Sequence, residues 1–212
     1  DIAQAANIAA GLLNPMLDFS RLEAGMVQPE IEEFPIATLL RDMDVRFRPQ
    51  VEKAGLELRI VPSNAVIRSD PVLLSLIVGN FLSNAERYTE TGRLLLGCRR
   101  HGDALRIEVW DTGPGIESEH LNSIFEEFHQ LDTATRDRDK GLGLGLAIVK
   151  AQASLLRHEV RVSTRLGRGS TFSIEVPLIG ATAQPAPIMD ADAVRPDFLA
   201  GRRMLILEDN LG

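Results

Sequence analysis

The sequence predicts an α+β fold in which antiparallel hairpins and amphipathic helices share one core. Two hairpins carry this prediction. Residues 93–100 and 104–110 flank a Gly-Asp turn, and residues 159–164 and 170–177 flank a Gly-Arg-Gly turn. Elsewhere, apolar side chains recur at the spacing of helices. The chain has 212 residues, which is enough for one full domain with appendages.

Composition narrows the class of protein. Apolar residues make up 44% of the chain and charged residues 25%, as in ordinary globular proteins. A net charge of −7 argues against a nucleic-acid-binding surface, so no nucleic acid is expected as a partner. Cys98 is the single cysteine, which excludes an intramolecular disulfide and favours a reducing compartment. Without a long apolar run or a basic leader, the chain is expected to be cytoplasmic, whether or not its parent carries a membrane anchor elsewhere.

The N-terminal part predicts two helices and three strands. Residues 1–24 carry an apolar stripe interrupted by Pro15, and Gly25 ends it. This helix packs either on partner helices outside the chain or on its own domain. A short strand over 30–34 follows, and then a helix from Pro35 to Lys53. Residues 56–61 and 65–68 predict two further strands.

The remaining elements alternate in the same way. Asp70-Pro71 is a helix start, and the helix that it opens runs to about Tyr88. After the first hairpin, residues 117–140 predict short helical pieces, and a helix over 144–156 precedes the second hairpin. Residues 180–201 are rich in Ala and Pro, as in a linker. Residues 202–210 then predict the first strand of another domain.

Two asparagines lie four residues apart near the end of the long helix. This spacing places Asn80 and Asn84 on one face, with Arg87 one turn later and Tyr88 beside it. An amide oxygen is a suitable ligand for Mg²⁺ that also binds phosphate oxygens. Taken alone, the same pattern equally fits exposed polar residues at a helix end.

Two glycine-rich stretches are the other candidate binding motifs. Asp111-Thr112-Gly113-Pro114-Gly115-Ile116 puts a carboxylate at the end of a strand, next to glycines that allow close approach of another molecule. Residues 141–145, Gly-Leu-Gly-Leu-Gly, lead into a helix whose first N–H groups can bind phosphate. Neither the P-loop nor the Rossmann pattern fits their context. Between them, Phe125 and Phe128 predict an anchor, and residues 132–140 predict a mobile lid or a plain surface loop.

The joint order of these motifs resembles the catalytic ATP-binding domain of sensor histidine kinases. NFLSNAERYTE resembles the N box of that family, DTGPGI its G1 box, IFEEFHQ its F box and GLGLGLAIVK its G2 box. The resemblance implies the Bergerat fold, a two-layer α/β sandwich with a mixed, mostly antiparallel sheet and helices on one face. It also implies that the chain binds ATP and Mg²⁺ and transfers a phosphoryl group to histidine.

The resemblance assigns roles to individual positions. Asn84 would hold Mg²⁺, and Asn80, Asn84 and Arg87 would be the catalytic residues that place the phosphates. Asp111 would accept a hydrogen bond from the adenine amine, with Thr171 supporting the same edge through water. Leu142 stands where many family members have Thr. The full expected ATP-binding set is Asn80, Asn84, Arg87, Tyr88, Asp111, Gly113, Gly115, Ile116, Lys140, Gly141, Leu142, Gly143, Leu144, Gly145 and Thr171.

The resemblance also implies a domain order and partners. Residues 1–25 would end the second helix of a dimerisation and phosphotransfer hairpin, 26–179 would be the catalytic domain, 180–201 a linker and 202–212 the truncated start of a receiver domain. The parent would be a homodimer that signals to its receiver domain or to a response regulator. The acceptor histidine would lie outside this chain, because none of its four histidines falls on a family-like acceptor helix. They are His101, His120, His129 and His158.

Two other functions share these motifs. ATP hydrolases of the gyrase, Hsp90 and MutL kind place a Glu, the base for water, where this chain has Asn80. A neutral amide cannot take that proton, so a kinase is favoured over a hydrolase. A non-catalytic module that binds nucleotide as a regulatory switch is the other alternative, although the intact motifs speak against it.

Overall fold

The structure is a computed structural model that describes residues 16, 20, 22, 24–129 and 143–181, together with the backbone of 203–207. Most of the predicted N-terminal helix, the predicted lid over 132–140 and most of the predicted linker lie outside the described residues. So do Lys140, Gly141 and Leu142 of the expected site, and residues 208–210 of the strand predicted over 202–210.

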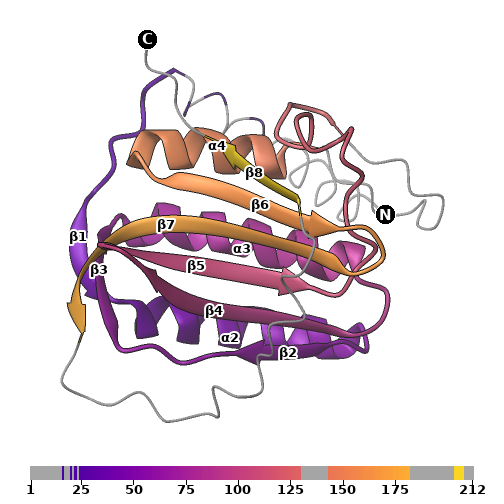
Figure 1. Ribbon diagram of the computed structural model, residues 1–212. Helices are drawn as coiled ribbons and strands as arrows, with labels where there is room; N and C mark the ends of the chain where they lie inside the picture. Colours follow the sequence, from indigo (N-terminus) through magenta and orange to yellow (C-terminus); the bar gives the residue numbers. More distant parts are fainter. Residues whose placement is uncertain are drawn as a thin grey trace, which may run out of the picture.

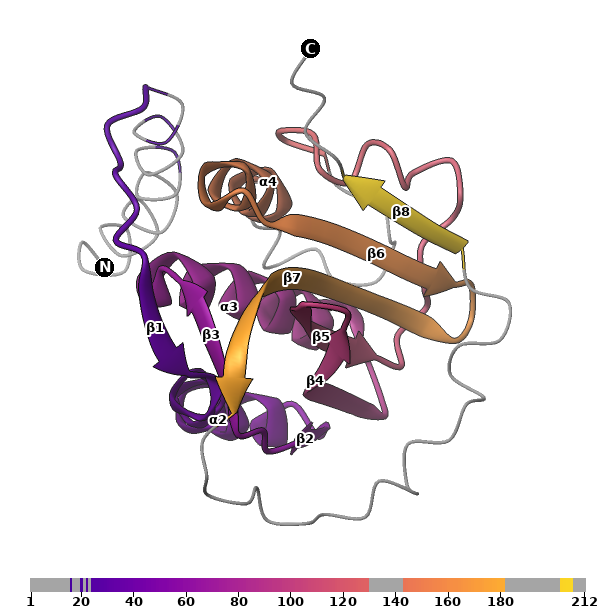
Figure 2. The same cartoon turned by 60° about the vertical axis from the view of Figure 1, so that its left-hand side comes forward.

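One curled sheet organises the fold, and helices cover one of its faces (Figures 1 and 2). Its strands lie in the order β1-β3-β7-β5-β4-β2, with β6 on β7 and β8 on β6. Pairings among the described strands are antiparallel, except that β2 runs parallel to β4. The strands are β1 (Glu32–Pro35), β2 (Glu57–Ile60), β3 (Ala65–Ser69), β4 (Arg93–His101), β5 (Ala104–Asp111), β6 (Glu159–Arg165), β7 (Gly169–Ala181) and β8 (Arg203–Leu207).

Three helices form the second layer: α2 (Ile36–Lys53), α3 (Pro71–Tyr88) and α4 (Gly145–Leu156). Their apolar faces and the inward side chains of the sheet make one core, since burial of apolar surface drives their packing. Phe81 of α3 stacks on Phe172 of β7, with ring centroids 5.6 Å apart. The helix that carries both asparagines is thereby packed on the longest strand.

Asp70 explains why α3 begins where it does. Its Oδ1 accepts hydrogen bonds from the backbone N–H groups of Val72 (2.8 Å) and Leu73 (2.9 Å), which would otherwise have no partner at a helix start. Its Oδ2 accepts a third from the N–H of Glu30 at 2.8 Å. The cap predicted from the sequence is confirmed, and it also ties the chain before β1 to the helix.

The predicted fold class is confirmed, and so are both hairpins and the three helices of the domain. Some details differ. The strands predicted at 56–61 and 65–68 do not pair with each other, because β2 lies at one edge of the sheet and β3 near the other. The short helical pieces predicted from 117 onward are turns over 118–128. β7 is also longer than predicted and extends to Ala181, where it pairs with β3.

Residues 203–207 form a strand, as predicted, and this strand pairs antiparallel with β6. Figure 2 shows β8 along the outer edge of the sheet, beside β6. Pairing covers the N–H and C=O groups that an edge strand otherwise exposes. The assignment of this strand to a separate receiver domain stays a prediction.

Charged side chains cover part of the sheet face that points away from the helices. Glu175 of β7 accepts hydrogen bonds from Arg106 of β5 at 2.8 and 2.6 Å, and Arg161 and His101 lie 3.6 and 3.2 Å from the same carboxylate oxygen. Burial alone would raise the pKa of Glu175, but the hydrogen bonds from Arg106 and the neighbouring positive charges outweigh it and lower the pKa. The carboxylate is therefore ionised and links β5, β6 and β7.

Candidate functional site

The N-terminus of α4 lies against the middle of α3. A Cβ placed on Gly145, the first residue of α4, would stand 3.1 Å from Asn80 Oδ1, which is tighter than most real contacts. Asn80 is held in place because its Nδ2 donates to the carbonyl of Leu76 at 3.0 Å. The structure thus brings together the first asparagine and the last glycine of the predicted glycine run.

The C-terminus of α3 lies against the loop that follows β5. A Cβ on Gly113 would stand 2.9 Å from the carbonyl oxygen of Tyr88 and 3.3 Å from Oγ1 of Thr89, the residue that caps α3. Glycine is required here because any side chain would collide with the end of the helix. The close approach brings the backbone of Tyr88 next to the Asp111 loop.

One helix therefore spans both candidate regions. Asn80 meets the start of α4, Tyr88 meets the Asp111 loop, and Asn84 lies midway between them on α3. Eight residues at a rise of 1.5 Å place the two ends about 12 Å apart along the helix. This distance is comparable to the span between the base and the terminal phosphate of an extended nucleoside triphosphate.

Asp111 is the buried carboxylate of the site, with 5% of its surface exposed. Its Oδ1 accepts hydrogen bonds from the backbone N–H groups of Gly113 (2.9 Å) and Ser170 (3.0 Å). Two N–H donors hold the carboxylate in one orientation.

The residue beside Asp111 is Ser170, and this corrects the prediction for Thr171. Alternate residues of a strand point to opposite faces, and Phe172, which contacts α3, sets the inward face. Thr171 pairs with Trp110 and lines a small pocket on the outer face with Arg106 and other outward residues. Sequence reasoning missed Ser170, although the alternation of apolar residues in β7 would have shown that position 170 shares the inward face with 172.

Glycines at two positions let the second hairpin approach the Asp111 loop. A Cβ on Gly169 would stand 2.0 Å from the carbonyl oxygen of Asp111, and one on Gly115 would stand 2.4 Å from that of Arg165. Both glycines have positive φ, +91° and +77°, so a side chain would also be strained. The loop and the hairpin tip are therefore joined by direct backbone contact.

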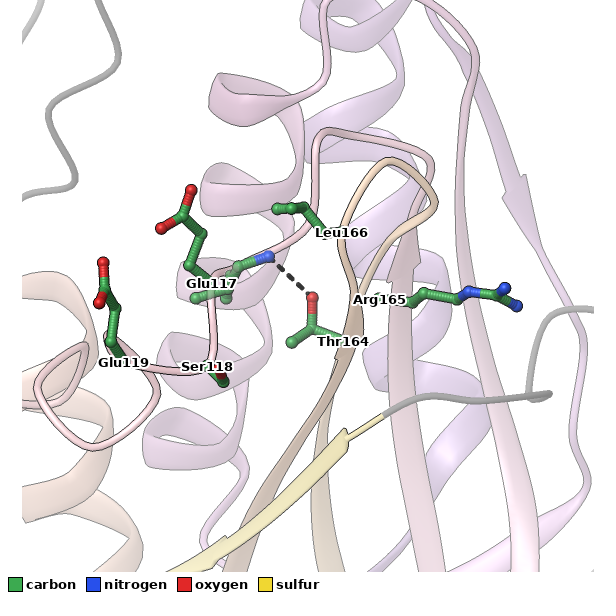
Figure 3. A pocket seen from close by; sticks show the side chains of 7 residues that line it. Glu117, Ser118, Glu119, Thr164, Arg165 and Leu166 are labelled. Atoms are coloured by element: carbon green, nitrogen blue, oxygen red, sulfur yellow. Dashed lines mark hydrogen bonds between the residues drawn. The ribbon is translucent and has the colours of Figure 1, made fainter.

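Hydrogen bonds strengthen the same junction. Thr164 Oγ1 accepts from the N–H of Ile116 at 2.9 Å, and the N–H of Gly167 donates to the carbonyl of Pro114 at 2.6 Å. Figure 3 shows this Thr164 contact at the mouth of a pocket of about 460 Å³, with Arg165 turned away from the glutamates across it. The described lining of this pocket includes neither Asn84 nor Asp111. It consists of Ile116, Glu117, Ser118, Glu119, Thr164, Arg165 and Leu166.

The remaining predicted residues have different surroundings. Arg87 is exposed in the last turn of α3, Leu144 is buried at the N-cap of α4, and Gly143 before it has φ +70°. Phe125 is buried in the core, which confirms half of the predicted aromatic anchor. Phe128 is 55% exposed, so its part of that prediction is wrong.

None of the four histidines lies on a helix in the part of the chain that the structure describes. His101 ends β4, and His120 and His129 belong to the turns after Glu117. His158 lies between α4 and β6, and its Nε2 is 2.8 Å from Ser69 Oγ. Burial lowers the pKa of His158, against a weaker opposite effect of a backbone hydrogen bond. It is a structural residue of the domain.

The fold and the site define a class of protein. In this α+β sandwich, α3 extends from the glycine at the start of α4 to the buried carboxylate in the Asp111 loop. This arrangement is typical of a nucleotide-binding domain. A family model described as "Histidine kinase-, DNA gyrase B-, and HSP90-like ATPase" matches residues 69–180. The chain belongs to this family of ATP-binding domains.

Its relatives are named as sensor kinases. It is 36% identical over 209 residues to "Autoinducer 2 sensor kinase/phosphatase LuxQ" of Vibrio cholerae, a match that covers 94% of this chain and 24% of LuxQ. It is 33% identical over 173 residues to "Sensor histidine kinase RcsC" of Escherichia coli, covering 80% of this chain and 18% of RcsC. The chain thus spans about a quarter or less of the curated relatives that it matches.

Solved structures of histidine kinases have a similar fold. The chain resembles full-length ShkA in complex with AMPPNP, with a TM-score of 0.75 and 33% identity, over 87% of this chain and 38% of ShkA. The catalytic domain of the histidine kinase ThkA has the same fold, with a TM-score of 0.60 over 70% of this chain and 97% of ThkA, at 24% identity. Among the described residues, no helix combines the length and the apolarity needed to span a membrane.

Proposed function

We propose that this domain transfers the γ-phosphoryl group of Mg-ATP to a histidine on a dimerisation hairpin of its parent protein. One observation carries the proposal: α3 meets the start of α4 at Asn80 and the Asp111 loop at Tyr88, so a single rigid helix spans the length of a nucleotide. Phosphoryl transfer depends mainly on positioning and charge neutralisation, which suits a site without a protein nucleophile.

Each group has a proposed role. Asp111 accepts a hydrogen bond from the adenine amine, and Ser170 helps to fix Asp111. Asn80 and Arg87 place the phosphates, and the first N–H groups of α4 bind them. The predicted residues Lys140, Gly141 and Leu142 complete the phosphate end of the site in this proposal.

Asn84 would hold Mg²⁺. Its side chain fits because an amide oxygen is a hard, neutral ligand, and its place on α3, one turn beyond Asn80 and midway along the site, supports this role. The bound metal would neutralise phosphate charge during transfer. In the reaction, a nitrogen of the acceptor imidazole forms a bond to the γ-phosphorus, the bond from that phosphorus to the β–γ bridging oxygen breaks, and ADP leaves.

The partners in this proposal lie outside the chain. The acceptor histidine is on a hairpin whose second helix ends within residues 1–25, and the parent is a homodimer built on that hairpin. A receiver domain that begins near residue 202, or a separate response regulator, then takes the phosphoryl group. The names of LuxQ and RcsC as sensor kinases support a signalling role.

A transfer assay tests the proposal. This chain is mixed with a separate hairpin-bearing piece of the parent and with labelled ATP and Mg²⁺, and phosphate on the hairpin is tested for lability in acid and stability in base. We expect phosphohistidine on the hairpin, and we expect Asn84→Ala to abolish it. Gln50→Ala, which removes an exposed amide from α2, is the matched control and should leave transfer unchanged.

The same assay separates the alternatives. Release of inorganic phosphate without labelling of the hairpin would indicate a hydrolase, which Asn80 disfavours because an amide cannot act as a base for water. Tight binding of ATP with neither transfer nor release would indicate a regulatory module. Either result would overturn the proposed kinase activity.

A further inference from the structure

Thr89 carries a buried hydroxyl group next to the candidate base pocket. The residue follows the last turn of α3 and is 2% exposed. Its Oγ1 has no hydrogen-bond partner within the described part of the chain. Buried hydroxyl groups in proteins are almost always hydrogen-bonded, so this one needs an explanation.

The position of the hydroxyl group indicates what it faces. A Cβ on Gly113 would stand 3.3 Å from Thr89 Oγ1 and 3.0 Å from Asp111 Oδ1. The two side-chain oxygens thus lie close to the same side of Gly113, where a Cβ would not fit. Thr89 therefore stands beside the loop from which Asp111 is expected to bind the base.

Neighbouring hydroxyl groups behave differently. Thr164 Oγ1 accepts from the N–H of Ile116, and Thr112 Oγ1 accepts from the N–H of Arg93 at 3.0 Å. The fold therefore supplies partners for the hydroxyl groups that hold this loop together. Thr89 is not used in that way, although its backbone N–H makes the ordinary capping bond to Ala85.

We infer that Thr89 is a second polar residue of the base pocket and helps Asp111 to select a purine that carries an amino group. Its hydroxyl group, unused by the fold, gains its partner when nucleotide binds. The inference rests on the proposed function, because it assumes that adenine lies against the Asp111 loop. It assigns to Thr89 a role in specificity, which a purely structural residue would not have.

The test compares two nucleotides that differ at the base edge. ATP carries an amino group at position 6 of the purine, and ITP carries an oxygen there. Dissociation constants of both are measured by titration calorimetry in Mg²⁺ for the chain and for Thr89→Val, which keeps the shape of the side chain and removes the hydroxyl group. We expect Thr89→Val to weaken ATP binding about three- to tenfold and to change ITP binding less than about twofold.

Two further variants make the result specific. Thr89→Ser restores the hydroxyl group and should recover the preference for ATP. Thr171→Val removes a buried hydroxyl group on the outer face of the sheet and should leave the ratio of the two affinities unchanged. The melting temperature of nucleotide-free Thr89→Val should not fall, since the hydroxyl group that it loses has no partner in the fold. If the valine variant does not fold, Thr89→Ala takes its place.

An equal loss of affinity for ATP and ITP, or no loss for either, would overturn the role of Thr89. A melting temperature lowered as much as by Thr164→Val would do the same, because it would show a partner within the fold. These results leave the proposed function standing if the hairpin is still phosphorylated. Conversely, failure of phosphotransfer with the ATP preference intact would overturn the proposed kinase and not the role of Thr89.

Discussion

Asp111→Asn tests where the base lies. In the structure, Oδ1 of Asp111 accepts two backbone hydrogen bonds, from Gly113 and Ser170. An asparagine at this position must keep its oxygen toward those two N–H groups, because an amide nitrogen there would face donors. Its NH₂ group then takes the place of the other carboxylate oxygen. The substitution therefore replaces an acceptor by a donor at a fixed point.

The size of the effect follows from that geometry. ATP loses a hydrogen bond to a charged acceptor, and its amine faces another donor, so we expect a loss of about 2–3 kcal/mol, or about 30- to 150-fold in affinity. ITP presents an oxygen at the same position and should bind better to the variant than to the parent chain. The fold should stay intact, because both backbone donors keep an oxygen acceptor.

Calorimetric titration with both nucleotides checks this prediction, and thermal unfolding of the nucleotide-free chains reports on the fold. Asp103→Asn is the control, because it removes one exposed charge in the turn between β4 and β5. Unchanged ATP affinity in Asp111→Asn would refute the placement of the base. An equal loss for both nucleotides would refute the argument from the locked orientation.

Three further predictions concern other parts of the chain. Gly145→Ala should weaken binding of Mg-ATP about tenfold in titration, because the added Cβ would stand 3.1 Å from Asn80 Oδ1 and displace it. The control is Gly79→Ala inside α3, where the added Cβ would make ordinary contacts of 3.7 Å or more. This variant should raise the free energy of unfolding by about 0.5–1 kcal/mol and leave the binding of Mg-ATP unchanged. Equal binding by the two variants would contradict the contact at Asn80. Glu175→Gln should lower the free energy of unfolding by about 1–2 kcal/mol at pH 7, measured in urea. The pKa of Glu175 is lowered from 4.5, so its contribution is complete above that pH and is lost progressively as the pH falls toward the lower pKa of the folded state. A difference that does not shrink between pH 7 and pH 3 would count against the ion cluster. Burial, and to a smaller extent the nearby carboxylate of Glu108, raises the pKa of the Cys98 thiol to about 12. The folded chain should therefore resist alkylation at pH 8, and the chain unfolded in urea should react fully. Rapid alkylation of the folded chain would disprove this prediction.

Much of the fold could be predicted because its signals are local. Asp70-Pro71 marks the start of α3 through two short-range hydrogen bonds, and glycine turns mark both hairpins. What the sequence did not show is pairing between distant strands. The parallel contact of β2 with β4 and the position of β3 beside β7 depend on the whole sheet, and no short stretch of sequence encodes them.

The candidate site was predictable in its motifs and less so in its details. Asn80, Gly145 and Asp111 were identified from sequence, and the structure brings the first two together. The family resemblance assigns Thr171 to the adenine edge, whereas the alternation of side chains along β7 places Ser170 beside Asp111. Thr89 went unnoticed because its significance depends on the absence of a partner, which only coordinates reveal.

The contact between Asp111 and the second hairpin affects how this domain tolerates mutation. Position 111 both orients the hairpin through Ser170 and leaves no room for a side chain at Gly169. Most changes at either position should therefore remove the protein from the cell by misfolding before any defect in nucleotide recognition is seen. Asn84, which the described contacts do not tie to the second hairpin, should tolerate substitution without loss of the fold. A genetic screen that scores protein level beside activity should therefore find stable but inactive variants mainly along α3.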